Sequence, residues 1–139
     1  FNKNKKIIYH TADLNMQEVD YPNLDIQNMD IVDCSYDYIL CNHVLEHVKN
    51  DELALKEINR VLSPNGKAII TIPGDLTRHK TKSFNSVLPN GHFRDYGYDY
   101  INILKKYFGN ILIINMCRFD SSSKYGIKPN EVAFIVTKS

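Results

Sequence analysis

Hydrophobic positions along the chain follow two periods, one typical of strands and the other of amphipathic helices. The stretches Asp37 to Asn42 and Lys67 to Pro73 are short aliphatic and aromatic runs without polar alternation, which predicts two strands covered on both faces. Between them, from Asp51 to Leu62, apolar residues recur three and four positions apart, which predicts a helix. The turn residues Ser63 to Gly66 end it. A strand, a helix and a strand in this order indicate part of a parallel sheet.

The first residues carry weaker strand patterns. Lys6 to Leu14 is rich in β-formers and ends in a polar turn, which predicts the first visible strand. Pro22 to Gln27 is a second candidate, although Asp25 interrupts it and Pro22 restricts it to an edge or a strand start.

The second half of the chain predicts one helix and a final pair of strands. Gly74 to Gly91 has no periodicity and is long for a connection, which favours a functional lid. Tyr98 to Phe108 has a helical pattern that Gly109 stops. The strands Asn110 to Arg118 and Glu131 to Lys138 are separated only by turn residues, so they should be antiparallel. The predicted fold is α/β and Rossmann-like, with a mostly parallel sheet and a C-terminal antiparallel hairpin.

Composition limits the classes of protein that remain. A chain of 139 residues, 43% of them hydrophobic, can form one core, which predicts a single domain over residues 1–139. A net charge of +1 gives no support for a nucleic-acid partner, and no apolar stretch reaches the ~20 residues that cross a bilayer. We therefore expect neither a nucleic acid nor a membrane as partner. The unpaired cysteines favour a cytoplasmic protein, with Cys41 as a small buried hydrophobe.

Three motifs occur in an order that resembles one family. Residues 25–37 read D-I-Q-N-M-D-I-V-D-C-S-Y-D, residues 44–48 read V-L-E-H-V, and residues 57–66 read E-I-N-R-V-L-S-P-N-G. They resemble the D-x-x-x-L-P-F-x-D-x-S-F-D, V-L-E-H-V and E-x-x-R-V-L-K-P-G-G patterns of class I S-adenosylmethionine-dependent methyltransferases. Residues 91–96, G-H-F-R-D-Y, are similar to the G-H-x-R-x-[FY] of the same family.

The resemblance implies a fold, a cofactor and a missing front. The cofactor would be S-adenosyl-L-methionine, with S-adenosylhomocysteine as product. Nothing in the chain resembles the Gly-rich turn that follows the family's first strand. Since Phe1 is also not an initiator Met, we expect that one strand and one helix precede it and that the domain is N-terminally incomplete. That gap would leave an open sheet edge beside the Asp37 strand, which a homodimer could cover.

The resemblance also suggests cofactor-binding residues, each with a plainer alternative. Asp13, followed by Leu14, would accept hydrogen bonds from the ribose hydroxyls, or would be a solvated strand end or a helix-capping group. Asp25 and Ile26 would border adenine, or would belong to an edge-strand turn. The remaining pair, Asn42 and His43, follows the central strand at the carboxyl edge where α/β sheets bind ligands.

The catalytic candidates are His43 as proton acceptor, and His92 with Arg94 as groups that grip the acceptor; Arg94 could equally tie its loop to the domain. A structural role is the safer expectation for Glu46 and His47 at a helix start. Because His43, His79 and His92 show no ligand spacing and no nearby carboxylate cluster, no metal site is predicted.

Glu57 and Arg60 should form an exposed ion pair of little energetic weight, and Asn50 or Asp51 should cap the helix.

Three functions remain open. The first is methyl transfer to an oxygen, nitrogen or carbon of a small-molecule or glycan acceptor, in which the protein mainly aligns donor and acceptor. The second is a non-catalytic or truncated methyltransferase-like module that acts in binding or assembly. The third is a nicotinamide-dependent oxidoreductase, which shares the fold class but is disfavoured by the motifs above.

Overall fold

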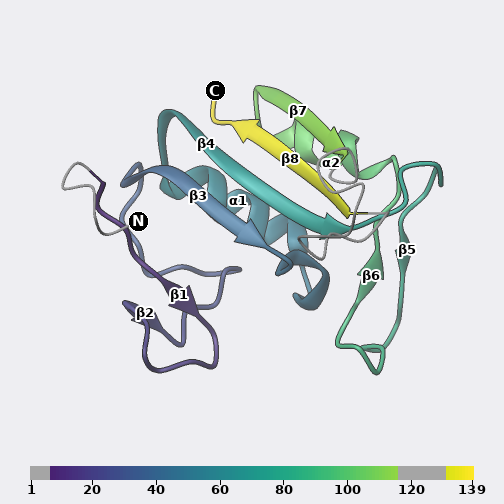
Figure 1. Cartoon of the computed structure of the whole chain (residues 1–139), viewed down its shortest axis with the longest axis horizontal. Helices are drawn as coiled ribbons and strands as arrows, with labels where there is room; N and C mark the ends of the chain where they lie inside the picture. The colour runs from purple at the N-terminus through teal and green to yellow at the C-terminus, as the bar shows by residue number, and fades with distance from the viewer. Residues whose placement is uncertain (1–6, 116–130) are drawn as a thin grey trace, which may run out of the picture.

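The central feature of the computed structural model is a four-stranded sheet with two helices on one face (Figure 1). The structure describes residues 7–115 and 131–139. The strands lie in the order β3-β4-β8-β7, where β3 is Tyr36–Asn42, β4 is Leu62–Pro73, β8 is Glu131–Thr137 and β7 is Asn110–Asn115. The pair β3 and β4 is parallel, whereas β8 runs antiparallel to both β4 and β7. These pairings give an α/β Rossmann-like fold with the predicted antiparallel pair at its end.

Helix α1, Asp51–Val61, begins where Asn50 caps it: the Asn50 side chain accepts a hydrogen bond from the Leu53 amide. The helix α2, Tyr100–Tyr107, follows later in the chain. Both lie behind the sheet in Figure 1 and bury aliphatic residues such as Leu55, Ile58 and Leu104 completely. Each such side chain contributes about 1.5–3 kcal/mol by leaving water.

Strand β3 corrects the expectation of a strand covered on both faces. Alternate residues Ile39 and Cys41 pack on the helix side, while Tyr38 is 70% exposed and Leu40 is 61% exposed. The reason is that β3 is the edge of the described sheet, and no described helix covers its second face.

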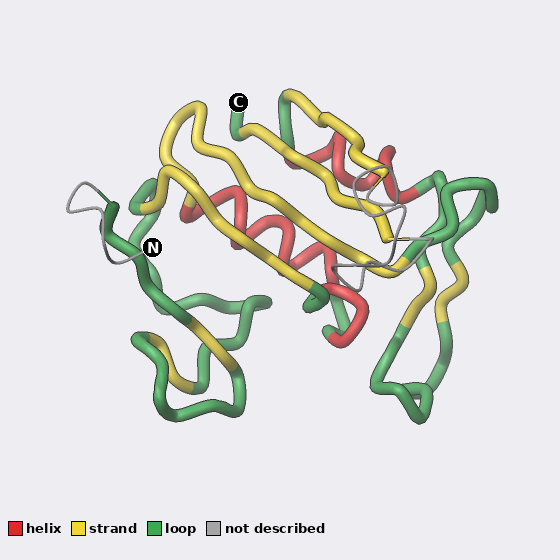
Figure 2. Tube along the Cα trace, in the orientation of Figure 1, coloured by secondary structure: helices red, strands yellow, loops and turns green. Residues whose placement is uncertain are grey.

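The N-terminal strands are much shorter than predicted. Only Ala12–Asp13 forms β1, and only Tyr21–Pro22 forms β2, its parallel partner (Figure 2). The Pro22 to Gln27 candidate fails because the chain turns after Pro22: Asn23 has a φ of 58°, and the Asn28 amide bonds to the Asp25 carbonyl at 2.9 Å.

The Gly74 to Gly91 region belongs to a two-stranded arm and not to an irregular loop alone. The short strands β5, Lys82–Ser83, and β6, Arg94–Asp95, pair antiparallel and extend beyond the sheet in Figure 1. A 3-10 turn, η1 (Leu45–His47), lies beside β6, and the Phe93 amide donates to the Glu46 carbonyl at 2.8 Å.

The turn residues predicted between the last two strands, like the end of the Asn110 to Arg118 strand, lie outside the described residues. Within the described ranges, no helix is both long and apolar enough for a transmembrane span.

Candidate functional site

The carboxyl end of β3 presents two of the predicted residues, Asn42 and His43. Asn42 is the last residue of the strand and accepts a hydrogen bond from the Thr71 hydroxyl of β4. His43 has a φ of 52°, an uncommon conformation that turns the chain sharply out of the strand. Its amide bonds to the Thr71 carbonyl at 3.1 Å, so the strand ladder holds this turn in place.

Two carboxylates flank the His43 ring. Nδ1 lies 3.1 Å from Glu46 Oε1, and Nε2 lies 3.7 Å from Glu131 Oε1 at the start of β8. Glu46 is 1% exposed, whereas His43 is 34% exposed. A half-exposed histidine held against a buried carboxylate has the arrangement of a base oriented by a second group.

Asp13 is placed at the end of β1 with one carboxylate oxygen engaged. Oδ1 accepts the amides of Asn15 and Met16 at 2.7 and 2.9 Å, and these two bonds lower the pKa of the carboxyl. Oδ2 has no hydrogen-bond partner among the described residues. Leu14 is 55% exposed beside it. The capping alternative thus accounts for one oxygen of Asp13, and the other stays available to a ligand.

Asp25 and Ile26 lie in a turn that is tied to Asp13 and to α1. The Leu24 amide bonds to the Asp13 carbonyl at 3.1 Å. Asp25 Oδ1 accepts the Gln27 amide at 2.9 Å, and the Gln27 side chain in turn accepts the Asn50 amide at 2.9 Å. Ile26 packs against the hydrophobic core.

A hollow of about 400 Å³ opens along this turn, lined by Asp20, Tyr21, Pro22, Asn23, Leu24, Asp25, Asn28 and Asp30.

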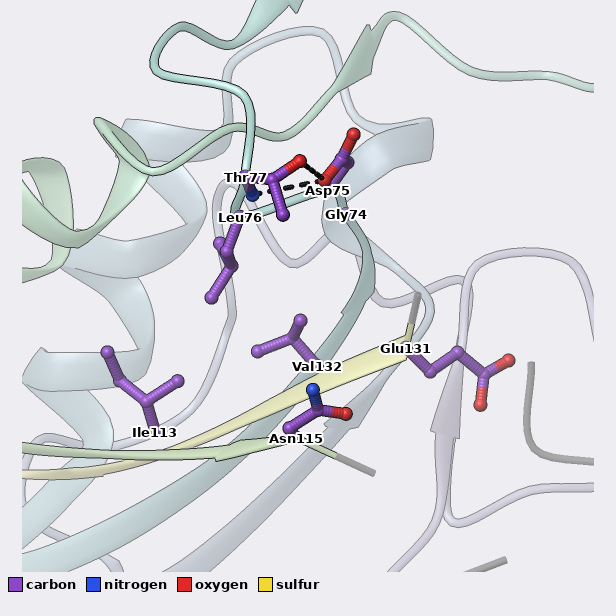
Figure 3. A pocket seen from close by; sticks show the side chains of 8 residues that line it. All are labelled: Gly74, Asp75, Leu76, Thr77, Ile113, Asn115, Glu131 and Val132. Carbon is purple, nitrogen blue, oxygen red and sulfur yellow. Dashed lines mark hydrogen bonds between the residues drawn. The ribbon is translucent and has the colours of Figure 1, made fainter. Parts of the chain in front are cut away.

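A second hollow lies at the carboxyl end of β4. It has a volume of about 240 Å³ and is lined by Gly74, Asp75, Leu76, Thr77, Ile113, Asn115, Glu131 and Val132. In Figure 3 the side chains of Leu76, Ile113 and Val132 point toward one another, while Asp75 bonds to Thr77. Glu131, whose side chain points away from these three in Figure 3, also lies 3.7 Å from His43 at the end of β3. Sequence reasoning missed this region because its lining residues come from three separate segments.

Arg94 has a structural role. It is buried, and its guanidinium donates to the carbonyls of Leu45, Val48 and Lys49 at 2.8–2.9 Å. With its donors so engaged, Arg94 ties β6 to the segment between η1 and α1. This is the second of the two roles suggested by the sequence, in which Arg94 ties its loop to the domain.

His92 lies next to η1, and its ring packs edge-to-face on the ring of His47 with centroids 4.8 Å apart. Together with Glu46 these residues form a group of three side chains that could hold a metal ion, which the spacing of the histidines along the chain did not indicate. The signal was present in the sequence as Glu46-His47, but the 45-residue separation from His92 hid the third member.

Cys41 is 3% exposed, and burial raises the pKa of its thiol to about 12, which confirms the prediction of a small buried hydrophobe.

Known proteins resemble this chain in sequence and in fold. Residues 3–70 match the sequence profile of a family described as a methyltransferase domain. A SAM-dependent methyltransferase from Thermotoga maritima is 20% identical with a TM-score of 0.60, over 82% of this chain and 61% of that chain. Phosphoethanolamine N-methyltransferase 2 of Haemonchus contortus, in complex with S-adenosylhomocysteine, is 16% identical with a TM-score of 0.55, over 82% and 36% of the two chains.

A third structure, the SpnF cyclase, is 14% identical with a TM-score of 0.59, over 86% of this chain and 55% of that chain. No curated protein matches the sequence. The chain spans less than two thirds of the length of each of these three structures. At sequence identities of 20% or less, the likeness concerns the fold.

The profile match over residues 3–70, just under half of the chain, and the shared Rossmann-like fold support a class I S-adenosylmethionine-dependent methyltransferase, a family whose cofactor is S-adenosyl-L-methionine.

Proposed function

We propose that this single domain transfers a methyl group from S-adenosyl-L-methionine to an oxygen, nitrogen or carbon of a small-molecule or glycan acceptor. The observation that carries the proposal is the position of two acids. Asp13 ends β1, Asp25 follows the parallel neighbour β2, and the Leu24 amide ties the two segments together. Ends of parallel strands at one edge are where α/β sheets bind nucleotides.

Each predicted cofactor residue has a role in the proposal, those of β1 and β2 in a two-stranded sheet and those at the end of β3 in the four-stranded sheet. The free Oδ2 of Asp13 would accept a ribose hydroxyl, with Leu14 beside it, while Asp25 and Ile26 would border adenine. Asn42 and His43 would lie nearer the reacting end. The cofactor supplies the activated methyl group, so the protein needs chiefly to align the acceptor and to take up its proton. His43, oriented by Glu46, is the proposed proton acceptor.

The acceptor would occupy the hollow of about 240 Å³ beside Glu131. Its apolar side chains, Leu76, Ile113 and Val132, suit a small organic group (Figure 3). Of the solved relatives, the Haemonchus enzyme is in complex with phosphomonomethylethanolamine, a small molecule.

Calorimetric titration with S-adenosylhomocysteine tests the proposal. We expect saturable binding that Asp13→Ala weakens at least tenfold, because the variant removes the ribose acceptor. Glu18→Ala is the matched control, since this exposed acid lies in the same segment outside the proposed contacts. No binding by a chain with native circular dichroism, or equal binding by both variants, would reject the assignment of this edge.

The exposed face of β3 supports the second candidate function, a non-catalytic module that acts in binding or assembly. The SpnF cyclase, which shares the fold, is named for a different activity. A folded chain that forms a stable dimer and binds no S-adenosylhomocysteine would favour this alternative.

A further inference from the structure

Three side chains with metal-binding atoms converge between η1 and the arm. One potential ligand atom each of Glu46, His47 and His92 lies within 4.8 Å of the other two. Glu46 is 1% exposed, the His92 side chain is 17% exposed and His47 is 45% exposed. The group is thus buried on the Glu46 side and open to solvent on the His47 side, as an ion site with an entry path requires.

The backbone fixes the tautomer of His47. Nδ1 lies 3.0 Å from the carbonyl oxygen of Gly91. A carbonyl only accepts hydrogen bonds, so Nδ1 carries the proton, and in the neutral ring the lone pair is on Nε2. That nitrogen lies 4.0 Å from Glu46 Oε1. Metal-binding histidines are commonly oriented by a hydrogen bond of this kind from the other ring nitrogen.

Two atoms of the same group are buried without a hydrogen-bond partner among the described residues, Glu46 Oε2 and His92 Nδ1. Each such atom costs about 1–3 kcal/mol if nothing compensates it. The other Glu46 oxygen is engaged by His43 Nδ1 at 3.1 Å, while the nearest acid to His92 Nδ1 is Asp95 at 3.9 Å. A cation between Glu46 and His92 would satisfy both atoms at once.

We propose that Glu46, His47 Nε2 and His92 Nδ1 bind a first-row divalent transition-metal ion such as Zn²⁺. Two imidazole nitrogens and one carboxylate oxygen suit Zn²⁺, Co²⁺ or Mn²⁺ better than Mg²⁺ or Ca²⁺. Bonds near 2.1 Å place ligands roughly 3.4 Å apart in a tetrahedral site, so small side-chain rotations close the observed spacing. Three protein ligands leave a position for water or an oxygen donor of a bound molecule.

The surrounding hydrogen bonds hold the segments that carry Glu46, His47 and His92 close together. The Phe93 amide bonds to the Glu46 carbonyl, and Arg94 bonds to the Leu45 carbonyl, so the residues after His92 are tied to η1 by two hydrogen bonds of 2.8 and 2.9 Å. Gly91 has a φ of 82°, and a Cβ there would lie 3.0 Å from His47 Nδ1. These contacts hold the group together without any bound cofactor, so metal binding can be tested in the absence of S-adenosyl-L-methionine.

The test is calorimetric titration of the untagged, EDTA-treated full chain with ZnCl₂, together with the absorption spectrum of the Co²⁺ complex. We expect one ion per chain. His47→Ala and His92→Ala should each weaken binding more than about 100-fold, because loss of a mere supporting residue costs 10–100-fold. Glu46→Gln keeps the size of the buried side chain and should weaken binding similarly. His79→Ala, at an exposed histidine outside the group, is the control and should bind as the native chain does.

A thermal melt gives a second readout on the same variants. Zn²⁺ that binds the folded state should raise the Tm of the native chain and of His79→Ala, but not that of the folded Glu46→Gln variant. Absence of Zn²⁺ binding by the folded native chain would overturn the proposal, as would unchanged affinity in His47→Ala, His92→Ala or Glu46→Gln.

Discussion

Arg60 is the most connected side chain on α1. Its guanidinium donates to both carboxylate oxygens of Glu57 at 2.8 Å and to the carbonyls of Met29 and Ile31, and it also pairs with Asp33. Glu57 in turn accepts the Met29 amide at 2.8 Å. The prediction of an exposed ion pair with little energetic weight is therefore wrong: Arg60 and Glu57 belong to a partly buried hydrogen-bond network. The pattern on the helix correctly indicated the i, i+3 contact, but could not show that residues 29–33 wrap over it.

Glu57→Gln should lower the free energy of unfolding by about 1–2 kcal/mol at pH 7, since it removes a charged acceptor. The hydrogen bond from Arg60, then that from the Met29 amide, lowers the pKa of Glu57 below its ordinary 4.5. A carboxyl whose pKa is lowered by folding stabilises above its unfolded pKa and loses that contribution as the pH falls through the folded value. Urea unfolding at pH 7 and pH 3 measures this.

The difference between Glu57→Gln and the native chain should accordingly be large at pH 7 and small at pH 3. Asp37→Asn, which alters an acid that bonds only to Ser63 among the described residues, serves as the control. A difference that stays the same at both pH values would contradict the charge-assisted role of Glu57.

Gly91 links the arm to the His47 ring. Gly91→Ala should weaken Zn²⁺ binding, because the positive φ disfavours alanine and the new Cβ would press on Nδ1. The same titration measures it, with Gly74→Ala as control, where a Cβ meets its nearest neighbour at an ordinary 3.5 Å. Equal affinity in the two variants would show that Gly91 does not position the ring.

Among the elements, the arm depends on one buried arginine. Arg94→Met should destabilise the chain by about 3 kcal/mol, because it leaves three carbonyls without their donor. Hydrogen exchange at residues 82–95 and the thermal melt measure the effect. Lys80→Met, at an exposed position close to the arm, should change neither the hydrogen exchange nor the melting temperature. A similar loss of stability in both variants would show that the lost positive charge, and not the lost hydrogen bonds, is the cause.

Helices and strands differed in how well their patterns predicted them. Asp51 to Leu62 and Tyr98 to Phe108 enclose the observed helices, because helical spacing is a local property. The β3 and β4 strands were also found, but burial of β3 was not, because it depends on which neighbour is present. Lys6 to Leu14 failed as a strand within the described residues because β1 pairs with only two residues of β2.

The whole sheet has unequal faces. A row of Leu40, Ile69, Ile135 and Leu112 crosses the four strands in register on the side away from the helices. Its ends are exposed, Leu40 at 61% and Leu112 at 58%. An apolar row that ends at the edge strand of the described sheet favours association.

We therefore expect the chain of residues 1–139 to associate with itself as concentration rises, and Leu40→Lys to shift it toward monomer. Sedimentation velocity measures both. Val87→Lys, which charges an exposed apolar residue on the arm, should leave association unchanged. A native chain that stays monomeric throughout, or an equal shift in the two variants, would contradict an interface at this face.

The candidate site was predictable only where its residues follow a local sequence pattern. The motifs resemble the methyltransferase family whose profile matches residues 3–70, and Asn42 and His43 lie at the end of β3, as the sequence predicted. The metal-ligating group was not predicted, because only the fold brings His92 to Glu46. The hollow beside Glu131 likewise needs the pairing of β4 with β8, which no local pattern encodes.

The rate at which the buried thiol of Cys41 is alkylated also reports how often the core opens. Because the thiol is shielded within the core and its pKa is raised to about 12, alkylating reagents can modify it only in molecules whose core has opened. Cys34 is exposed and reacts without any opening. In a chain with Cys117→Ser, the fast labelling of one cysteine counts the molecules, and the slow labelling of the other times each transient loss of the β3 contacts.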